Sequence, residues 1–376
     1  MTQRELYLKT LLYQSPGKIP FHPGGPRKST IARWQTEGLP KDADWFDYML
    51  DRIGVKLPPV KPVPYTRTDF RMMPWFEEKI LEHKDGHYII QDWMGSILEI
   101  SDEFDYTYIR NAIDFVTRRW IKCPVETRED WAEMKKRYTA ATPERVTKHT
   151  PDEIKLINGR DSFWGISFNG PFWQMREWMG FEGLCMAMIE DPDFVAEMAE
   201  FWQNFVYDVL NRVFEQGIAP DYVHISEDMA YKAHCMISPA MTREFLLPSY
   251  KRWVRLCKSN GVQVIDMDSD GYIGELIPIW IEAGINVCDP IEVAAYNDIN
   301  EYAKLYGEKM AYRGGVDKRA IAAGGKIIEA ELKRLAPLFG GRGGFIPSCD
   351  HGVPNDISWD NYLYYTQLLA KYTGWL

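Results

Sequence analysis

The chain has 376 residues, of which 45% are hydrophobic and 26% are charged, and its formal net charge is −10. This composition is typical of a globular protein, and the length suits a single α/β barrel with added loops. An acidic chain repels the phosphates of nucleic acids and of anionic lipids, so neither nucleic acids nor membranes are expected as partners.

Cysteine usage and the N-terminus predict a cytoplasmic protein. The six cysteines are scattered without a CxxC pair, which is typical of a reducing compartment rather than of a disulfide framework. The first residues alternate polar and apolar side chains instead of forming the apolar core of a signal peptide. No apolar stretch reaches the roughly 18 residues that a membrane span requires.

Residues 1–150 are expected to form an N-terminal extension of one domain that spans residues 1–376. A short apolar run at Ile19–Phe21 predicts one strand, and a further strand is expected before residue 160. The segment Gly86–Ile100 (GHYIIQDWMGSILEI) has two apolar runs on either side of Met94-Gly95, which predicts a β-hairpin.

Residues 151–376 are expected to carry the main barrel strands, because short apolar runs alternate there with longer helical patterns. The six predicted strands are Phe163–Phe168, Tyr222–Ile225, Val262–Met267, Asn286–Cys288, Met310–Tyr312 and Gly344–Pro347. Apolar side chains spaced three and four residues apart predict a helix at Pro192–Phe214. Ser238 and Pro239 are typical of the N-cap and first residue of another helix, which ends near Gly261.

Strands separated by whole helices pair in parallel, so the sequence predicts a parallel α/β fold. With the strand near Ile19–Phe21 and the strand before residue 160, the number of strands reaches about eight, which favours a TIM-type (β/α)8 barrel. No GxGxxG motif follows an early strand, which argues against an open dinucleotide-binding sheet.

Polar side chains crowd the positions that end or follow the predicted strands. These segments are Ser226-Glu227-Asp228, Asp268-Ser269-Asp270-Gly271, Cys288-Asp289-Pro290, Arg313-Gly314-Gly315-Val316-Asp317 and Ser348-Cys349-Asp350-His351-Gly352. Each alone has a structural explanation, since aspartate and serine often cap the next helix or form a turn. Together they predict an active site, because the carboxyl ends of barrel strands converge on one mouth.

Several carboxylates in one barrel mouth require a compensating positive charge. A divalent cation relieves their mutual repulsion, and Cys349 as a thiolate favours zinc over magnesium. A basic substrate, or Arg313 and Lys232 as internal counter-ions, would serve the same purpose. His224 is expected to be a satisfied core histidine, and Asp266 to make a structural hydrogen bond.

Motifs spread over most of the chain are similar to those of one known family. They are Thr30–Trp34 with Glu37–Pro40, Gly170–Phe172 through Gly180-Phe181, Glu190–Pro192, Glu227–Lys232 with Ile237–Pro239, Asp268–Gly271 and Phe345–Pro354. Together they resemble the uroporphyrinogen decarboxylase superfamily, and within it the corrinoid-dependent methyltransferases of the O-demethylase type. The resemblance implies an α/β barrel, in agreement with the strand pattern.

Two departures from the family patterns bear on the reaction. The decarboxylase anchors the carboxylates of its tetrapyrrole with an Arg-rich N-terminal motif, whereas residues 19–28 contain only Arg27 and Lys28 as cations. The methyltransferases hold zinc with a His-x-Cys pair and a cysteine after the last strand. Cys349 matches that cysteine, but Asp268-Ser269-Asp270 stands where the pair is expected.

The resemblance implies transfer of a methyl group from a small methylated compound, an aryl methyl ether, to a corrinoid carried by a partner protein. It implies zinc held by Asp268, Asp270 and Cys349, with Glu227 or His351 as the fourth ligand. Whichever of these two is free would protonate the leaving group. Asp228 and Arg313 are expected to contact the substrate, and the 14 Trp, 21 Tyr and 17 Phe would suit a flat one.

Two other functions stay open at this point. The first is a metal-free decarboxylase or lyase that uses Asp270 and His351 as acid and base. The second is a non-catalytic barrel that binds a corrinoid or a porphyrin. A homodimer is also open, because Tyr372 and Trp375 would suit either a dimer contact or docking onto the body of the protein.

Overall fold

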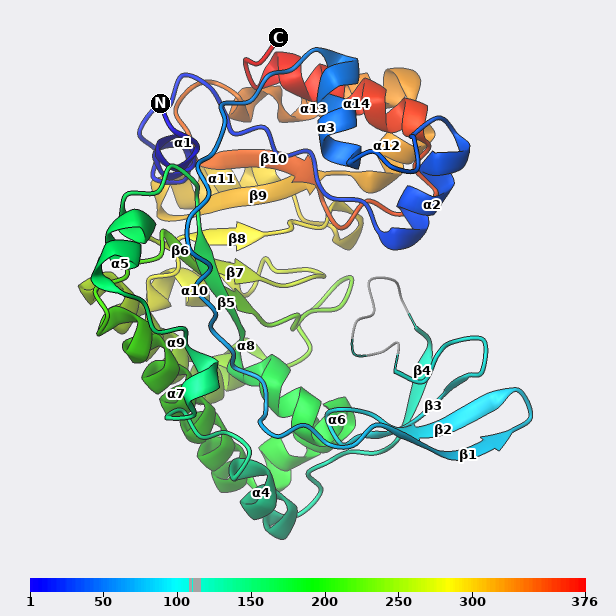
Figure 1. Ribbon diagram of the computed structural model, residues 1–376, viewed down its shortest axis with the longest axis vertical. Helices are drawn as coiled ribbons and strands as arrows, with labels where there is room; N and C mark the ends of the chain where they lie inside the picture. The colour runs from blue at the N-terminus through cyan, green and yellow to red at the C-terminus, as the bar shows by residue number, and fades with distance from the viewer. Residues whose placement is uncertain (108–109, 111–115) are drawn as a thin grey trace.

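A parallel sheet of six strands forms the centre of the computed structural model, which describes residues 1–107, 110 and 116–376 (Figure 1). Neighbouring strands follow the order β10-β9-β8-β7-β6-β5. Their bounds are β5 Gly165–Asn169, β6 Tyr222–Ser226, β7 Val264–Asp268, β8 Val287–Asp289, β9 Ala311–Val316 and β10 Phe345–Cys349. All six strands predicted after residue 163 are therefore confirmed, although β9 runs further than predicted.

Helices connect the strands and cover the outer face of the sheet (Figure 1). They are α6 Pro171–Glu190, α7 Pro192–Phe214, α8 Pro239–Met241, α9 Leu247–Ser259, α10 Ile277–Ala283, α11 Ile299–Tyr306, α12 Lys318–Ala323, α13 Gly325–Leu335 and α14 Trp359–Tyr372. The bounds of α7 match the prediction. Ser238 caps the N–H of Met241 as predicted, but a π-helical turn at Thr242–Leu246 separates α8 from α9.

The predicted closed barrel of eight strands is not found, because the parallel sheet stays open at β5 and β10 in the described part of the chain. Ile19–Phe21 is not a strand, and no described strand before residue 160 joins this sheet. Three prolines in residues 20–26 remove the backbone donors that a regular ladder needs. Extended chain lies at both edges instead: the Cys349 N–H donates to the Pro23 carbonyl at 3.1 Å, and the Phe70 ring centroid is 5.2 Å from that of Phe168.

The N-terminal region carries a second, antiparallel sheet in the order β1-β2-β3-β4. The elements of this region are α1 Gln3–Leu11, α2 Lys28–Thr36, α3 Trp45–Ile53, β1 Lys79–Lys84, β2 His87–Gln91, β3 Ile97–Ser101, β4 Arg118–Lys122, α4 Arg128–Lys135 and α5 Pro151–Asn158. The predicted hairpin is confirmed as β2 and β3, whereas β1 and β4 were missed. Their side chains are mostly exposed on both faces, so they lack the alternation that marks a strand.

The inner face of the parallel sheet is apolar at one end and polar at the other. A buried cluster fills the amino end: Leu11 of α1, Val264, Val287, Ala311 and Ile346. Two residues further along the same strands, and therefore on the same face, stand Asp266, Asp289, Arg313 and Ser348. Because α1 packs on the amino end, the carboxyl end is where a ligand can enter.

The C-terminus docks onto the body of the protein. The Trp375 indole N–H donates to the Ile19 carbonyl at 2.8 Å, and the Lys18 ammonium lies 4.5 Å from the Trp375 ring centroid. A homodimer stays a prediction. None of the helices in residues 1–107, 110 and 116–376 combines the length and the apolar character of a membrane span.

Candidate active site

Strand register brings the polar side chains at the carboxyl ends into rows. Ser226 of β6 pairs with Asp268 of β7, and Asp268 pairs with Asp289 of β8. His224 and Asp266 pair in a row closer to the centre of the sheet. Since alternate residues of a strand point to the same face, both rows face the interior.

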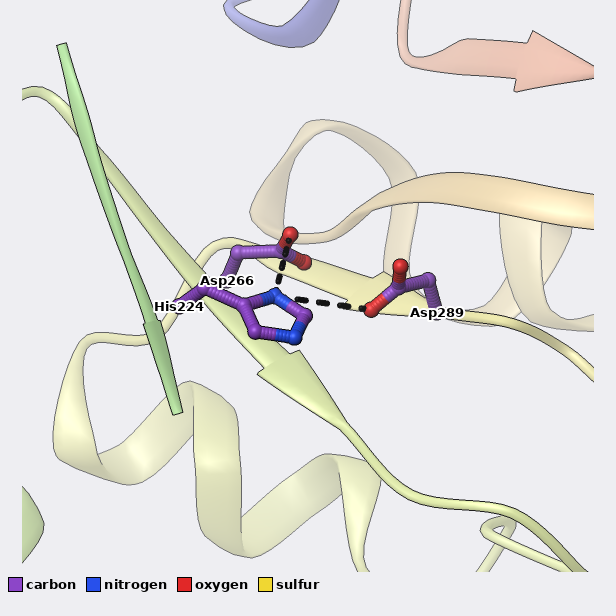
Figure 2. A group of neighbouring side chains, drawn as sticks. All are labelled: His224, Asp266 and Asp289. Atoms are coloured by element: carbon purple, nitrogen blue, oxygen red, sulfur yellow. Dashed lines mark hydrogen bonds and ion pairs between the residues drawn. The ribbon is translucent and has the colours of Figure 1, made fainter. Parts of the chain in front are cut away.

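A compact charge network joins these rows. His224 Nδ1 lies 3.1 Å from Asp266 Oδ2 and 4.0 Å from Asp289 Oδ1, and the three side chains point toward one another (Figure 2). Arg313 of β9 forms ion pairs with both carboxylates, with its Nη2 3.5 Å from Asp289 Oδ2. Asp268 Oδ2 lies 3.7 Å from His224 Nε2. Arg313 thus acts as the internal counter-ion that the sequence analysis considered, whereas Lys232 stacks on the Tyr296 ring.

Burial and neighbouring charges shift the protonation of this network. Burial and then the charge of Asp266 raise the pKa of Asp289 to about 7. Burial disfavours the charged imidazole, but hydrogen bonds to Asp266 and Asp268 hold the pKa of His224 well above its usual range. Burial also opposes ionisation of Asp266, but Arg313 outweighs it and lowers the pKa of that carboxyl. Asp289 is therefore the carboxyl of the network that most readily holds a proton near neutral pH.

A cavity of about 370 Å³ opens at the carboxyl ends of the strands. It is lined by six of the predicted site residues: Asp228, Asp268, Asp270, Arg313, Cys349 and His351. Asp289 and Trp173 also line this space, which we call the acidic cavity. Its four aspartates face one arginine, so its surface disfavours polyanions.

His351 and Asp270 form a pair in the wall of the acidic cavity. His351 Nε2 lies 3.0 Å from Asp270 Oδ2. The other ring nitrogen, Nδ1, accepts the Gly352 N–H at 2.8 Å and lies 3.1 Å from Arg27 Nη2. Because donors surround Nδ1, the imidazole proton sits on Nε2, at the cavity.

Glu227 lies outside the acidic cavity. It is fully buried, and one carboxylate oxygen accepts the Trp173 N–H at 2.9 Å while the other accepts the Tyr250 hydroxyl proton. Burial raises the pKa of Glu227 to about 7. The structure therefore does not bring Glu227 among the other predicted ligands; it ties the first turn of α6 to β6.

Asp228 is fixed by α6. Its backbone has a positive φ of 45°, its carbonyl accepts Arg176 Nη1–H at 2.9 Å, and its carboxylate lies 3.3 Å from Nη2. The same guanidinium stacks 4.8 Å from the Trp173 ring centroid. Arg176 thus positions a carboxylate and an aromatic ring that both line the cavity.

His224, Asp266 and Asp289 form a candidate metal site. Among the described residues, this is the group of at least three potential ligands whose donor atoms all lie within 4.8 Å of one another. Asp266 Oδ1 and Asp289 Oδ1 are buried without a hydrogen-bond partner, and imidazole nitrogen with carboxylate oxygen is a donor set that zinc accepts. The residues fit a divalent cation, which would compete with the Arg313 guanidinium for the same carboxylates.

The four zinc ligands predicted from the sequence are not the three residues of this candidate metal site, and they do not all face one cavity. Asp268, Asp270 and Cys349 line the acidic cavity, whereas Glu227 is turned away from it. Burial raises the pKa of the Cys349 thiol well above its usual value, so the thiol stays protonated unless a cation binds it. Zinc at Asp268, Asp270 and Cys349 stays a prediction.

Sequence patterns alone did not single out the centre of the network. From the sequence, His224 and Asp266 were expected to have structural roles, and Asp289 fitted a turn. The sequence does contain a signal for these residues. In each of β7, β8 and β9, a polar residue follows two positions after the apolar residue that faces the interior. Polar residues on the inner face of otherwise apolar strands are characteristic of barrel sites.

Comparison with known proteins assigns the family. The sequence profile described as uroporphyrinogen decarboxylase (URO-D) matches residues 125–372. The chain belongs to this family. Membership implies a TIM-type barrel, of which six strands are joined by hydrogen bonds in the described residues.

Comparisons with individual proteins found two further similarities. The uroporphyrinogen decarboxylase of Methylococcus capsulatus is 23% identical over 224 residues, which cover 57% of this chain and 62% of that protein. This chain thus spans less than two thirds of that relative. A methyltransferase from Methanosarcina mazei has a similar structure, with a TM-score of 0.47 and 15% identity over 68% of this chain and 72% of that one.

Proposed function

We propose that this enzyme moves a methyl group from a small methylated compound, such as an aryl methyl ether, to a corrinoid carried by a partner protein. The observation that carries the proposal is the acidic cavity, where four aspartates face one arginine. This surface disfavours a polyanionic porphyrinogen but not an uncharged ether. Its volume of about 370 Å³ suits a small ligand.

The residues of the cavity support protonation of the leaving group. When the methyl–oxygen bond breaks, the oxygen keeps the electron pair, and it departs more readily if it takes up a proton. His351 is the proposed donor, because its Nε2 proton lies at the cavity beside Asp270. Asp228 and Arg313 are proposed to contact the substrate, and Glu227 to hold Trp173 in place. The corrinoid supplies the nucleophile.

A bound metal would add Lewis-acid activation of the leaving oxygen. His224, Asp266 and Asp289 are the residues that would hold zinc in the network, and Asp268, Asp270 and Cys349 would hold it in the cavity. Elemental analysis separates the two sites: loss of zinc in Asp289→Asn but not in Cys349→Ala assigns the network. The opposite pattern assigns the cavity.

The direct test combines the protein with a cobalt(I) corrinoid protein and a panel of methoxyarenes. We expect a methyl-cobalt spectrum and release of the matching phenol. His351→Asn should slow the appearance of both signals about a hundredfold or more, whereas His234→Asn, which changes an exposed histidine, should leave the rate unchanged. Absence of phenol and methyl-cobalt across the panel, with a corrinoid carrier shown to accept methyl groups elsewhere, would contradict the proposal.

Decarboxylation is a second candidate, favoured by the pairing of Asp270 with His351. Such a reaction would release carbon dioxide from an acidic substrate without a corrinoid and would survive exhaustive chelation. Carbon dioxide release in the absence of any methyl acceptor would therefore favour this candidate.

A further inference from the structure

A second cavity of about 480 Å³ adjoins the first, and Trp173 lines both. Its walls come from the carboxyl end of β5, the start of α6 and the N-terminal region. In Figure 1 the N-terminal sheet projects on the side toward which the arrowheads of the parallel strands point. We call this space the arginine cavity, because it is lined by Arg67, Arg71, Arg110 and Arg118.

The arginine cavity has more positive than negative charge. Arg67 and Arg71 share a single carboxylate, that of Asp69, at 2.9 and 2.8 Å. Arg118 lies over the Trp120 ring, with its guanidinium carbon 4.8 Å from the ring centroid. Two lining carboxylates, Asp69 and Glu177, face the four arginines, and Glu78 outside the lining pairs with Arg110 at 3.2 Å, so four cations meet three carboxylates. The surplus favours an anionic ligand.

A buried arginine, Arg145, fixes the backbone that carries Arg67 and Arg71. Arg145 is fully buried and donates to the backbone carbonyls of Asp69 at 3.0 Å and Arg71 at 2.6 Å. Its remaining donors reach the carbonyls of Thr139 and Arg137. The backbone of residues 67–71 is therefore held in place before any ligand binds, which lowers the entropic cost of binding.

Flat aromatic side chains complete the arginine cavity. Trp93 and Trp173 line it, and Trp93 packs against Trp75 with ring centroids 5.4 Å apart. The guanidinium of Arg71 lies 5.1 Å from the Trp75 ring centroid. Guanidinium groups beside indole rings suit a ligand that combines a carboxylate with an aromatic ring.

We propose that the arginine cavity binds a flat organic anion, an aromatic ring that carries a carboxylate. Since Trp173 lines both cavities, the carboxylate lies among the arginines while the opposite end of the molecule reaches the acidic cavity. The ligand is then the substrate of the methyl transfer, and this last step rests on the proposed function. Arg67, Arg71 and Arg118 lie outside residues 125–372, so these cations belong to the part of the chain beyond the family match, whereas the walls from β5 and α6 lie within it.

Binding of 2-naphthoate, measured by isothermal titration calorimetry, tests the site without any turnover. The uncharged 2-naphthylmethanol serves as the matched ligand. We expect 2-naphthoate to bind at least tenfold more tightly than the alcohol. Arg71→Ala and Arg118→Ala should each weaken the acid at least tenfold and leave the alcohol unchanged. Arg255→Ala, which removes an exposed arginine of α9, should change neither affinity.

Equal affinity for the acid and the alcohol, or no effect of either arginine variant in protein with unchanged circular dichroism, overturns the inference. These outcomes are independent of methyl transfer. If an uncharged methoxyarene is demethylated but 2-naphthoate does not bind, the inference fails and the proposed function stands. If 2-naphthoate binds as expected but no methoxyarene is demethylated, the proposed function fails and the binding site stands.

Discussion

The two cavities lie side by side but differ in charge and in how each charge is held. In the acidic cavity, aspartates follow one another on neighbouring parallel strands, and the register of a regular sheet places them. In the arginine cavity, Arg67 and Arg71 come from a loop that the buried Arg145 holds by hydrogen bonds, and Arg118 comes from the edge strand β4. The first therefore depends on the sheet, whereas the second depends on a few long side chains of the N-terminal region.

The comparison also separates buried from exposed charge. Both carboxylates, Asp266 and Asp69, are buried, but the Arg313 side chain is 22% exposed whereas the Arg71 side chain is 51% exposed. Buried pairs are costly to break because the remaining charge has no solvent, while exposed pairs are screened by water and salt. An arginine should thus contribute mainly to folding stability in the acidic cavity and mainly to ligand affinity in the arginine cavity.

Arg313→Ala should have the largest effect on stability. It removes the guanidinium from Asp266 and Asp289, which keep the His224 imidazole as a counter-charge, and breaking a buried pair in this way costs about 3–5 kcal/mol. Arg71→Ala should cost about 1 kcal/mol or less, because Arg71 is half-exposed and Arg67 still contacts Asp69. Urea unfolding of both variants at pH 7 measures the difference. Similar losses would remove the distinction between the two cavities.

His351→Asn should lower the rate of methyl transfer about a hundredfold or more, since a positioned proton donor contributes at least that much. The stability of the variant should change little, because His351 sits in a cavity wall and not in the core. Rates of phenol release measure the effect, and His234→Asn provides the control. A hundredfold loss in Arg71→Ala at saturating substrate, with His351→Asn active, would move the chemistry out of the acidic cavity.

Most of the parallel sheet could be predicted because its strands are short apolar runs between long amphipathic helices. The sheet is not closed in the described residues because the residues beside β10 contain prolines and lie along the strand without a ladder. Strands β1 and β4 could not be predicted, since a strand exposed on both faces leaves no periodic signal. Local pattern predicts an element only where one of its faces is buried.

The candidate site divides in the same way. Asp268, Asp270 and His351 were predicted from their places after strands, and the structure brings them to one cavity. His224 was not recognised, because one sequence does not distinguish a satisfied core histidine from one that faces a carboxylate across a sheet. The arginine cavity could not be predicted from the sequence, because Arg71 and Arg118 come together only through tertiary packing.

The carboxyl group of Asp92, at the N-terminal sheet, predicts that folding stability depends on pH. Burial raises the pKa of this carboxyl to about 6, while its Oδ1 accepts the N–H groups of Met94 and Ser96 in the β2–β3 turn. The folded protein therefore keeps the proton to higher pH than the unfolded chain does, and stability falls as pH rises from about 4 through 6. Asp92→Asn should remove a loss on the order of 2 kcal/mol, measured by urea unfolding at pH 4.5 and 7.5. An unchanged slope would mean that Asp92 reaches solvent.

Asp69→Asn should have the smallest effect of these variants. It should raise the affinity for 2-naphthoate, whereas the arginine variants lower it. The Asp69 carboxylate competes with a bound anion for Arg67 and Arg71, so its removal should raise the affinity for 2-naphthoate about twofold to fivefold, the size expected of ion pairs whose arginines are half-exposed. The affinity for 2-naphthylmethanol should stay constant, and Asp102→Asn, on the antiparallel sheet beside His83, provides the control. Calorimetric titration measures all of these. A lower affinity in Asp69→Asn would show that the carboxylate orients the guanidinium groups more than it neutralises them. The arginine cavity would then depend on preorganised geometry as strictly as the acidic cavity depends on its sheet.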